Sequence, residues 1–131
     1  MDTIANLLSK IKNASMVSKD SVEVPYSKMN ENILKILKSE GYIKDLKVFK
    51  NKDSVIKGIN VSLNYTETGR PSINSLVRLS KPGRRIYRSA DTIVNKMGKF
   101  GTIIVSTSRG LMSVSEAKKK KLGGELVCEV F

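Results

Sequence analysis

Apolar residues in the first half of the chain follow helical spacing at its start. Ile4, Leu7, Leu8 and Ile11 recur every three or four positions, which predicts an amphipathic helix over residues 2–14. Lysines fall outside this apolar stripe. They are either solvated or in contact with phosphates, and the pattern leaves both interpretations open.

A short strand and a second helix are predicted next. Val22 and Val24 alternate with polar residues over 21–24, which is typical of a strand. Ser27 is placed to cap a helix that runs to about Glu40, because a serine hydroxyl accepts hydrogen bonds from free amide groups at a helix start.

Two further strands are predicted over 43–49 and 55–65, joined by a polar turn at 51–54. The first half therefore reads α-β-α-β-β. Residues 66–71 contain no apolar residue except a proline, so we expect a linker there. The predicted organisation is an N-terminal α/β subdomain (1–65), a linker (66–71) and a β-rich C-terminal subdomain (72–131), in the α+β class.

The second half begins with a predicted strand over 73–79. Pro82-Gly83 then signals a turn, and residues 89–97 favour a short helix or an irregular connection. Ile103 to Val105 form a β-branched run that predicts a buried strand.

A polar loop is expected after this run, over Ser106–Gly110. Ser115 is then placed to cap a brief helix whose last turn carries Lys118–Lys121. These lysines suit the negative end of the helix dipole and are otherwise solvated or bound to a partner. Gly123-Gly124 is expected to break the helix, and 125–131 alternates as a closing strand.

The charge of the chain indicates a class of binding partner, which the hydrophobic pattern does not. The 131 residues include 24 Lys and Arg against 12 Asp and Glu, a net charge of +12. Such an excess serves solubility or points to a polyanion, most simply nucleic acid. Every arginine follows Tyr65, so the second half is the better candidate for planar contacts with phosphates and base edges.

The composition gives little support for a catalytic or metal-binding function. The chain has no His and a single cysteine, Cys128, in the apolar run 126–128. Ser-His and Cys-His mechanisms are therefore excluded, and Cys128 is expected to be a buried, inert thiol. We expect no enzyme activity, cofactor, small-molecule substrate or membrane span, and an intracellular protein without a signal peptide.

Two segments carry the candidate binding chemistry. The loop Ser106–Gly110 offers hydroxyls, an arginine and a glycine that permits close approach. The segment Lys81–Arg88 joins several cations to Tyr87, whose ring either stacks on a base or faces the core. Gly98–Gly101 matches the G-x-x-G loop of KH domains, but a strand follows it directly, which does not fit that fold.

Double-stranded RNA suits these residues best. Its shallow minor groove exposes 2′-hydroxyls and base edges that small hydroxyl side chains reach, while arginines hold flanking phosphates. The alternative from another class is a basic DNA-binding regulator that reads bases with the predicted helix at 28–40, although this helix has no arginine. A purely protein-binding basic module is a third possibility.

Three separated segments resemble the bacterial-type small-ribosomal-subunit protein S-eight family. The segment Ser106–Met112, followed by Gly123-Gly124-Glu125, is similar to the family's S-T-S-x-G-[VL]-[ML] and G-G-E motifs. Ser80–Tyr87 resembles its S-K-P-G-x-R-x-Y motif, and 2–13 its opening helix. The usual family residue is replaced at four positions outside the hydroxyl loop, namely Thr3, Asn6, Ser113 and Phe131.

The resemblance implies a structural protein that binds the central domain of 16S rRNA and promotes small-subunit assembly. It also implies neighbours such as proteins S-five and S-twelve, repression of its own operon mRNA, and a place in the small subunit of a cytoplasmic or organellar ribosome. The predicted RNA-binding residues combine the family motifs with nearby cations and one helix lysine. They are Lys28, Lys81, Arg84, Arg85, Tyr87, Ser106, Thr107, Ser108, Arg109, Gly110, Gly124 and Glu125.

Overall fold

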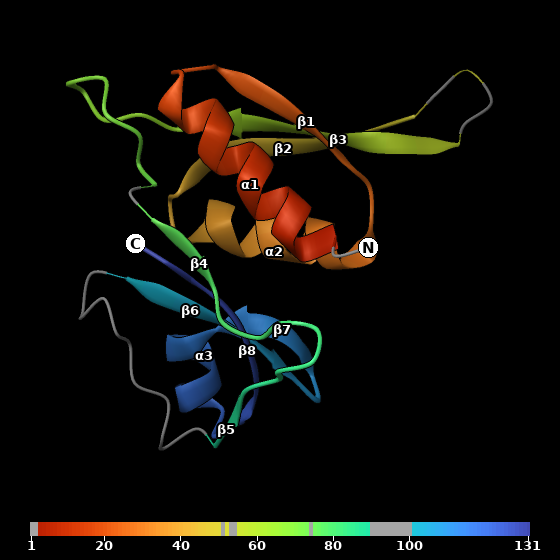
Figure 1. Cartoon of the computed structure of the whole chain (residues 1–131), viewed down its shortest axis with the longest axis vertical. Helices are drawn as coiled ribbons and strands as arrows, with labels where there is room; N and C mark the ends of the chain where they lie inside the picture. Colours follow the sequence, from red (N-terminus) through yellow and green to blue (C-terminus); the bar gives the residue numbers. More distant parts are fainter. Residues whose placement is uncertain (1–2, 51, 53–54, 74, 90–100) are drawn as a thin grey trace. The chain divides into compact units, whose positions relative to one another are not determined.

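The chain folds into two compact units, Met1–Ile73 and Asn74–Phe131. The computed structural model describes residues 3–50, 52, 55–73, 75–89 and 101–131. Each unit contains its own antiparallel sheet and its own buried side chains (Figure 1). The α+β class predicted from the sequence is confirmed.

The first unit has the predicted α-β-α-β-β order. Its elements are α1 (Thr3–Met16), β1 (Ser21–Pro25), α2 (Lys28–Ser39), β2 (Ile43–Lys50) and β3 (Ile56–Leu63). The strands form a sheet in the order β1-β3-β2, and both helices lie on the same side of it (Figure 1). Side chains from the helices and from β3 are fully buried between these layers, among them Leu7, Ile11, Ile33, Leu34, Leu37, Ile59 and Val61.

Local signals set the ends of α2 as the sequence predicts. The Ser27 hydroxyl accepts a hydrogen bond from the Asn30 amide at 3.0 Å, which satisfies one of the free donors of the first turn. At the other end Gly41 takes a φ of +84°, a left-handed conformation that costs glycine least.

The second unit is built around one central strand, β8 (Gly124–Val130). Its other elements are β4 (Leu76–Arg78), β5 (Tyr87–Arg88), β6 (Thr102–Thr107), β7 (Gly110–Ser113) and α3 (Val114–Lys119). The sheet runs β4-β8-β6-β7, and β5 pairs with the start of β8. Ile103, Val105 and Leu126 form a buried cluster.

Several predicted boundaries in this unit are wrong. The first strand is shorter than 73–79, and β6 continues through Ser106 and Thr107, which were expected in a loop. Their ladder pairing with Glu125 and Gly124 extends the strand despite their polar side chains. The predicted turn at 51–54 falls mostly, and the connection at 89–97 almost wholly, outside the described residues.

The cap of α3 is also different from the one predicted. Ser113, not Ser115, is the N-cap, and its hydroxyl accepts from the amide of Glu116. Ser113 ends a strand in an extended conformation, which is the backbone geometry of an N-cap, whereas Ser115 already lies inside the helix. The helix ends at Lys119, before Gly123.

Candidate nucleic-acid interface

Four strands of the second unit begin or end at the same edge of the sheet. At this edge their paired residues form two neighbouring rows that run across the strands. The outer row crosses β5, β8, β6 and β7 and consists of Arg88, Gly124, Thr107 and Gly110. The next row consists of Tyr87, Glu125, Ser106 and Leu111. We call these two rows, with the turn Ser108-Arg109 that joins β6 to β7, the polar sheet end. It unites residues from all three C-terminal motifs.

The turn that joins β6 to β7 is braced from within. The Thr107 hydroxyl donates to the Gly110 carbonyl at 2.8 Å and accepts from the Arg109 amide at 3.1 Å. Gly110, the residue after this turn, takes a φ of +105°, a left-handed conformation that favours glycine. The Thr107 hydroxyl is therefore engaged in the hairpin, while those of Ser106 and Ser108 have no hydrogen-bond partner among the described residues.

Gly124 is required by the close approach of β6. A Cβ atom at this position would lie 2.0 Å from the Ser106 carbonyl oxygen and 3.2 Å from the Thr107 Cα. These are backbone atoms, which cannot rotate away as a flexible side chain does. The glycine thus lets β8 and β6 pair closely at the polar sheet end.

A tight hairpin precedes β5 and presents its cations to solvent. Lys81 and Arg84 exchange backbone hydrogen bonds at 2.9 Å, and Gly83 takes a φ of +85° after Pro82, which is the pattern of a type II turn. The base of the hairpin is held by Ser80, which is buried and whose hydroxyl accepts from the Ile86 amide at 2.9 Å.

Tyr87 is exposed, with 61% of its surface accessible. The alternative in which its ring faces the core is therefore wrong. In the same row, Glu125 accepts an ion-pair hydrogen bond from the Arg85 guanidinium at 3.3 Å. The pair joins Arg85, two residues before Tyr87 in the chain, to the residue that faces Tyr87 on the neighbouring strand β8.

Arg88 belongs to the basic segment Lys81–Arg88 but was not among the RNA-binding residues predicted from the sequence. Its side chain is exposed, and it lies opposite Gly124 in the outer row. Its guanidinium donates to the Tyr87 carbonyl at 2.8 Å. The signal available in the sequence was its place at the end of the cation-rich segment Lys81–Arg88.

Negative charge is scarce on the described part of the second unit. Glu116 pairs with Lys120 at 3.1 Å, Glu125 pairs with Arg85, and Glu129 is only 2% exposed. The exposed cations near the polar sheet end are Lys81, Arg84, Arg88 and Arg109. Their charge is therefore largely uncompensated, which favours an anionic partner.

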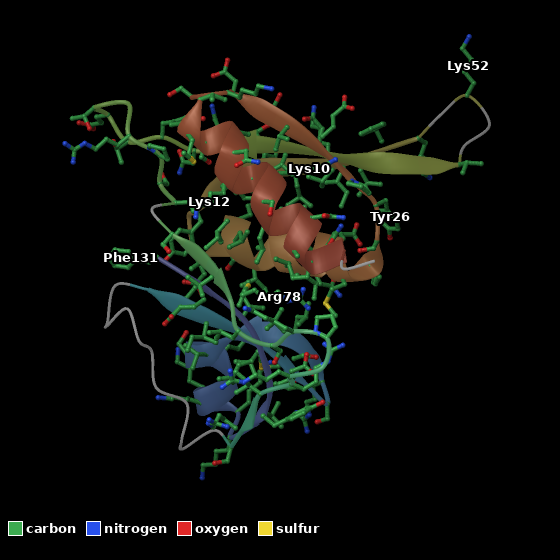
Figure 2. The ribbon with its side chains drawn as sticks, viewed as in Figure 1. Lys10, Lys12, Tyr26, Lys52, Arg78 and Phe131 are labelled. Atoms are coloured by element: carbon green, nitrogen blue, oxygen red, sulfur yellow. The ribbon has the colours of Figure 1, made fainter. Side chains whose placement is uncertain are left out.

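Lys28 belongs to the first unit and so is described apart from the polar sheet end. It lies at the start of α2, where its side chain is 75% exposed and sits 3.6 Å from a Glu31 carboxylate oxygen. Lys10 and Lys12 are exposed and project from different sides of α1 (Figure 2). The sequence left their role open, and the structure adds only their exposure.

Behind the interface, Cys128 is buried as predicted. Desolvation raises the pKa of its thiol to about 12, although the nearby Arg78 guanidinium acts in the opposite direction. Because the thiolate is the reactive form, this group is inert at neutral pH. Arg78 is half-buried in the second unit (Figure 2) and donates to the Ser80 carbonyl at 2.6 Å, so it helps to hold the base of the basic hairpin.

The described residues show neither a metal site nor a membrane helix. Over these ranges no three potential His, Cys, Asp or Glu ligands gather where they could hold an ion. None of the helices described combines the length and hydrophobicity needed to cross a bilayer.

Comparison with known proteins places these motifs in one family. The family model described as ribosomal protein S8 matches residues 2–131 of the chain. The chain belongs to this family. It is thus a ribosomal protein of the small subunit and not an enzyme.

Full-length relatives agree with this assignment. A protein named small ribosomal subunit protein uS8 from Thermodesulfovibrio yellowstonii is 44% identical over 130 residues, covering 99% of this chain and 98% of its own. Proteins of the same name from Campylobacter hominis and Nitratiruptor are 43% and 44% identical with the same coverage. The resemblance in the three motifs is therefore confirmed over the whole chain.

Proposed function

We propose that this chain binds the central domain of 16S rRNA through the polar sheet end and so promotes assembly of the small subunit. One observation carries the proposal most directly. Segments separated by up to 38 positions in the sequence, from Tyr87 to Glu125, meet as direct neighbours in two rows of one sheet. Tyr87, Glu125 and Ser106 are paired within one row and so share a face of the sheet, and this convergence supports one contact surface on that face.

The chemistry of this surface suits an irregular RNA helix. Ser106 and Ser108 offer uncharged hydroxyls that donate to or accept from 2′-hydroxyls and base edges. The exposed Tyr87 ring is available to stack on an unpaired base. Arginines around it supply charge-assisted contacts to phosphates, which position the protein without reading sequence.

Other predicted residues act through their neighbours instead. Thr107 holds the turn that presents Ser108 and Arg109, and Gly124 permits the close strand pairing. Glu125 orients Arg85. A carboxylate in direct contact with a phosphate would be repelled, so we infer a positioning role for Glu125 and not a direct contact with RNA.

The DNA-binding alternative is weaker because α2 has few free groups. Lys38 pairs with Asp45 at 3.0 Å, and Lys28 lies 3.6 Å from Glu31. Among the exposed lysines of α2, Lys35 alone lacks a carboxylate partner within the described residues. Such a helix offers little for reading base edges in a major groove.

Two further partners follow from the same surface and family. An mRNA of its own operon that folds like the rRNA site would bind the polar sheet end, which would repress translation. Neighbouring proteins S-five and S-twelve would contact surfaces that RNA leaves free. We propose both as consequences of family membership.

Tyr87 gives the direct test. Tyr87→Ala should weaken binding to a central-domain 16S rRNA fragment by about 5- to 150-fold, because about 1–3 kcal/mol of stacking is lost. Tyr87→Phe keeps the ring and should bind nearly as well as the wild type. Gel-shift titrations measure both, and circular dichroism confirms folding. Unchanged affinity in Tyr87→Ala, or tighter binding to duplex DNA of equal length, would overturn the proposal.

A further inference from the structure

The last turn of α3 forms a second basic surface in the same unit. Lys118 and Lys119 end the helix, Lys120 is its C-cap and Lys121 follows, and all four are exposed. We call these four residues the lysine turn. Lys120 is engaged by Glu116 at 3.1 Å, and the other three have no carboxylate partner among the described residues.

Topology brings the lysine turn back to the polar sheet end. The strand β7 leads away from the Ser108-Arg109 turn, and α3 follows β7 directly and packs on β6 and β7. After the helix the chain reaches Gly124, which pairs with Thr107. The three-residue step from Lys121 to Gly124 spans at most about 11 Å, even fully extended. The lysine turn therefore lies beside the outer row.

Lys121 is held in a conformation that suits glycine better. Its amide donates to the Lys118 carbonyl at 3.2 Å, and the next amide, of Leu122, donates to the Ala117 carbonyl at 2.9 Å. These two bonds define a Schellman motif, whose first residue beyond the cap is left-handed. Lys121 has a φ of +56°, where a Cβ atom is crowded by the backbone.

The helices α1 and α2 end in the same way and allow a comparison. Gly41 occupies the equivalent position after α2, with a φ of +84°, and Ser18 occupies it after α1, with a φ of +58°. Ser18 shows that a left-handed residue other than glycine is not by itself a sign of function. Lys121 differs because the strained residue also adds a charge at the edge of the proposed interface.

We propose that the lysine turn binds the phosphate backbone of the same RNA, with Lys121 as its main contact. The proposal rests on the proposed function and extends its footprint from the polar sheet end to α3. Lysine makes compact, sequence-independent contacts with phosphates, which suits the flank of a site whose specific contacts lie elsewhere. A lysine at position 121 thus lowers the stability of the fold and raises the affinity for RNA.

The variant Lys121→Gly tests both effects, on fold stability and on RNA affinity. The variant should melt a few degrees higher, because glycine adopts the left-handed conformation without strain. It should also bind a central-domain 16S rRNA fragment about three- to tenfold more weakly near 0.1 M salt. The slope of log K against log salt should become shallower by about 0.7–0.9, the contribution of one phosphate contact. Lys121→Gln should show the same binding loss without the rise in melting temperature.

Ser18→Gly is the matched control, since it removes the same backbone strain in the first unit without changing charge. It should raise the melting temperature and leave RNA affinity and salt slope unchanged. Equal binding losses in both glycine variants, or wild-type binding by Lys121→Gly and Lys121→Gln, would overturn the role of the lysine turn. If Tyr87→Ala still weakens binding in that case, the proposed function stands, and if it does not, both proposals fail.

Discussion

At the scale of single residues, close backbone packing at the polar sheet end restricts which side chains fit there. Gly124 is the clearest case, because the space that a side chain would need is occupied by backbone of β6. The sequence marked Gly124 only as part of a motif and as a helix breaker. Its physical role depends on a neighbour eighteen positions away, Ser106, and so was not visible locally.

Replacing Gly124 by alanine should therefore destabilise the fold by about 3 kcal/mol, at the upper end of overpacking effects. Gly83→Ala is the matched control in the same unit, since Gly83 has a φ of +85° but open space around it, and it should cost only about 1 kcal/mol. Urea denaturation of the two variants measures the difference. Equal losses would mean that β6 moves aside and that the close approach is not required.

At the scale of elements, the hydrophobic pattern predicted the order of helices and strands well and their ends less well. The α-β-α-β-β order and the Ser27 cap are confirmed, because both follow from local spacing. The polar end of β6 was expected as a loop, since three hydroxyl residues, an arginine and a glycine follow the apolar run there. Pairing with β8 decides the conformation of Ser106 and Thr107, and that pairing is not local.

The cap of α3 allows a direct test at this scale. Ser113→Ala should lower the free energy of unfolding by about 1 kcal/mol, because the Glu116 amide loses its acceptor at the helix start. Ser115→Ala should change it by less than about 0.5 kcal/mol, since Ser115 is not the cap. Thermal or urea unfolding compares the two. A larger loss from Ser115→Ala would restore the cap predicted from the sequence.

At the scale of the whole molecule, the net charge divides unequally between the two units. The second unit, Asn74–Phe131, holds twelve of the 24 Lys and Arg residues but only four of the 12 acids. The sequence alone located this asymmetry and the three motifs. It could not show that the motifs share adjacent rows, because the register between distant strands is set by tertiary pairing.

The central claim is that the polar sheet end binds the central domain of 16S rRNA. Hydroxyl-radical footprinting of full-length 16S rRNA tests it most directly, with the wild-type protein and with Ser108→Phe, whose bulk would block close approach of the turn. We expect one protected region within the central domain for the wild type, and loss of that protection in the variant with only weak, salt-sensitive binding left. Protection outside the central domain, or an unchanged footprint with Ser108→Phe, would contradict the account.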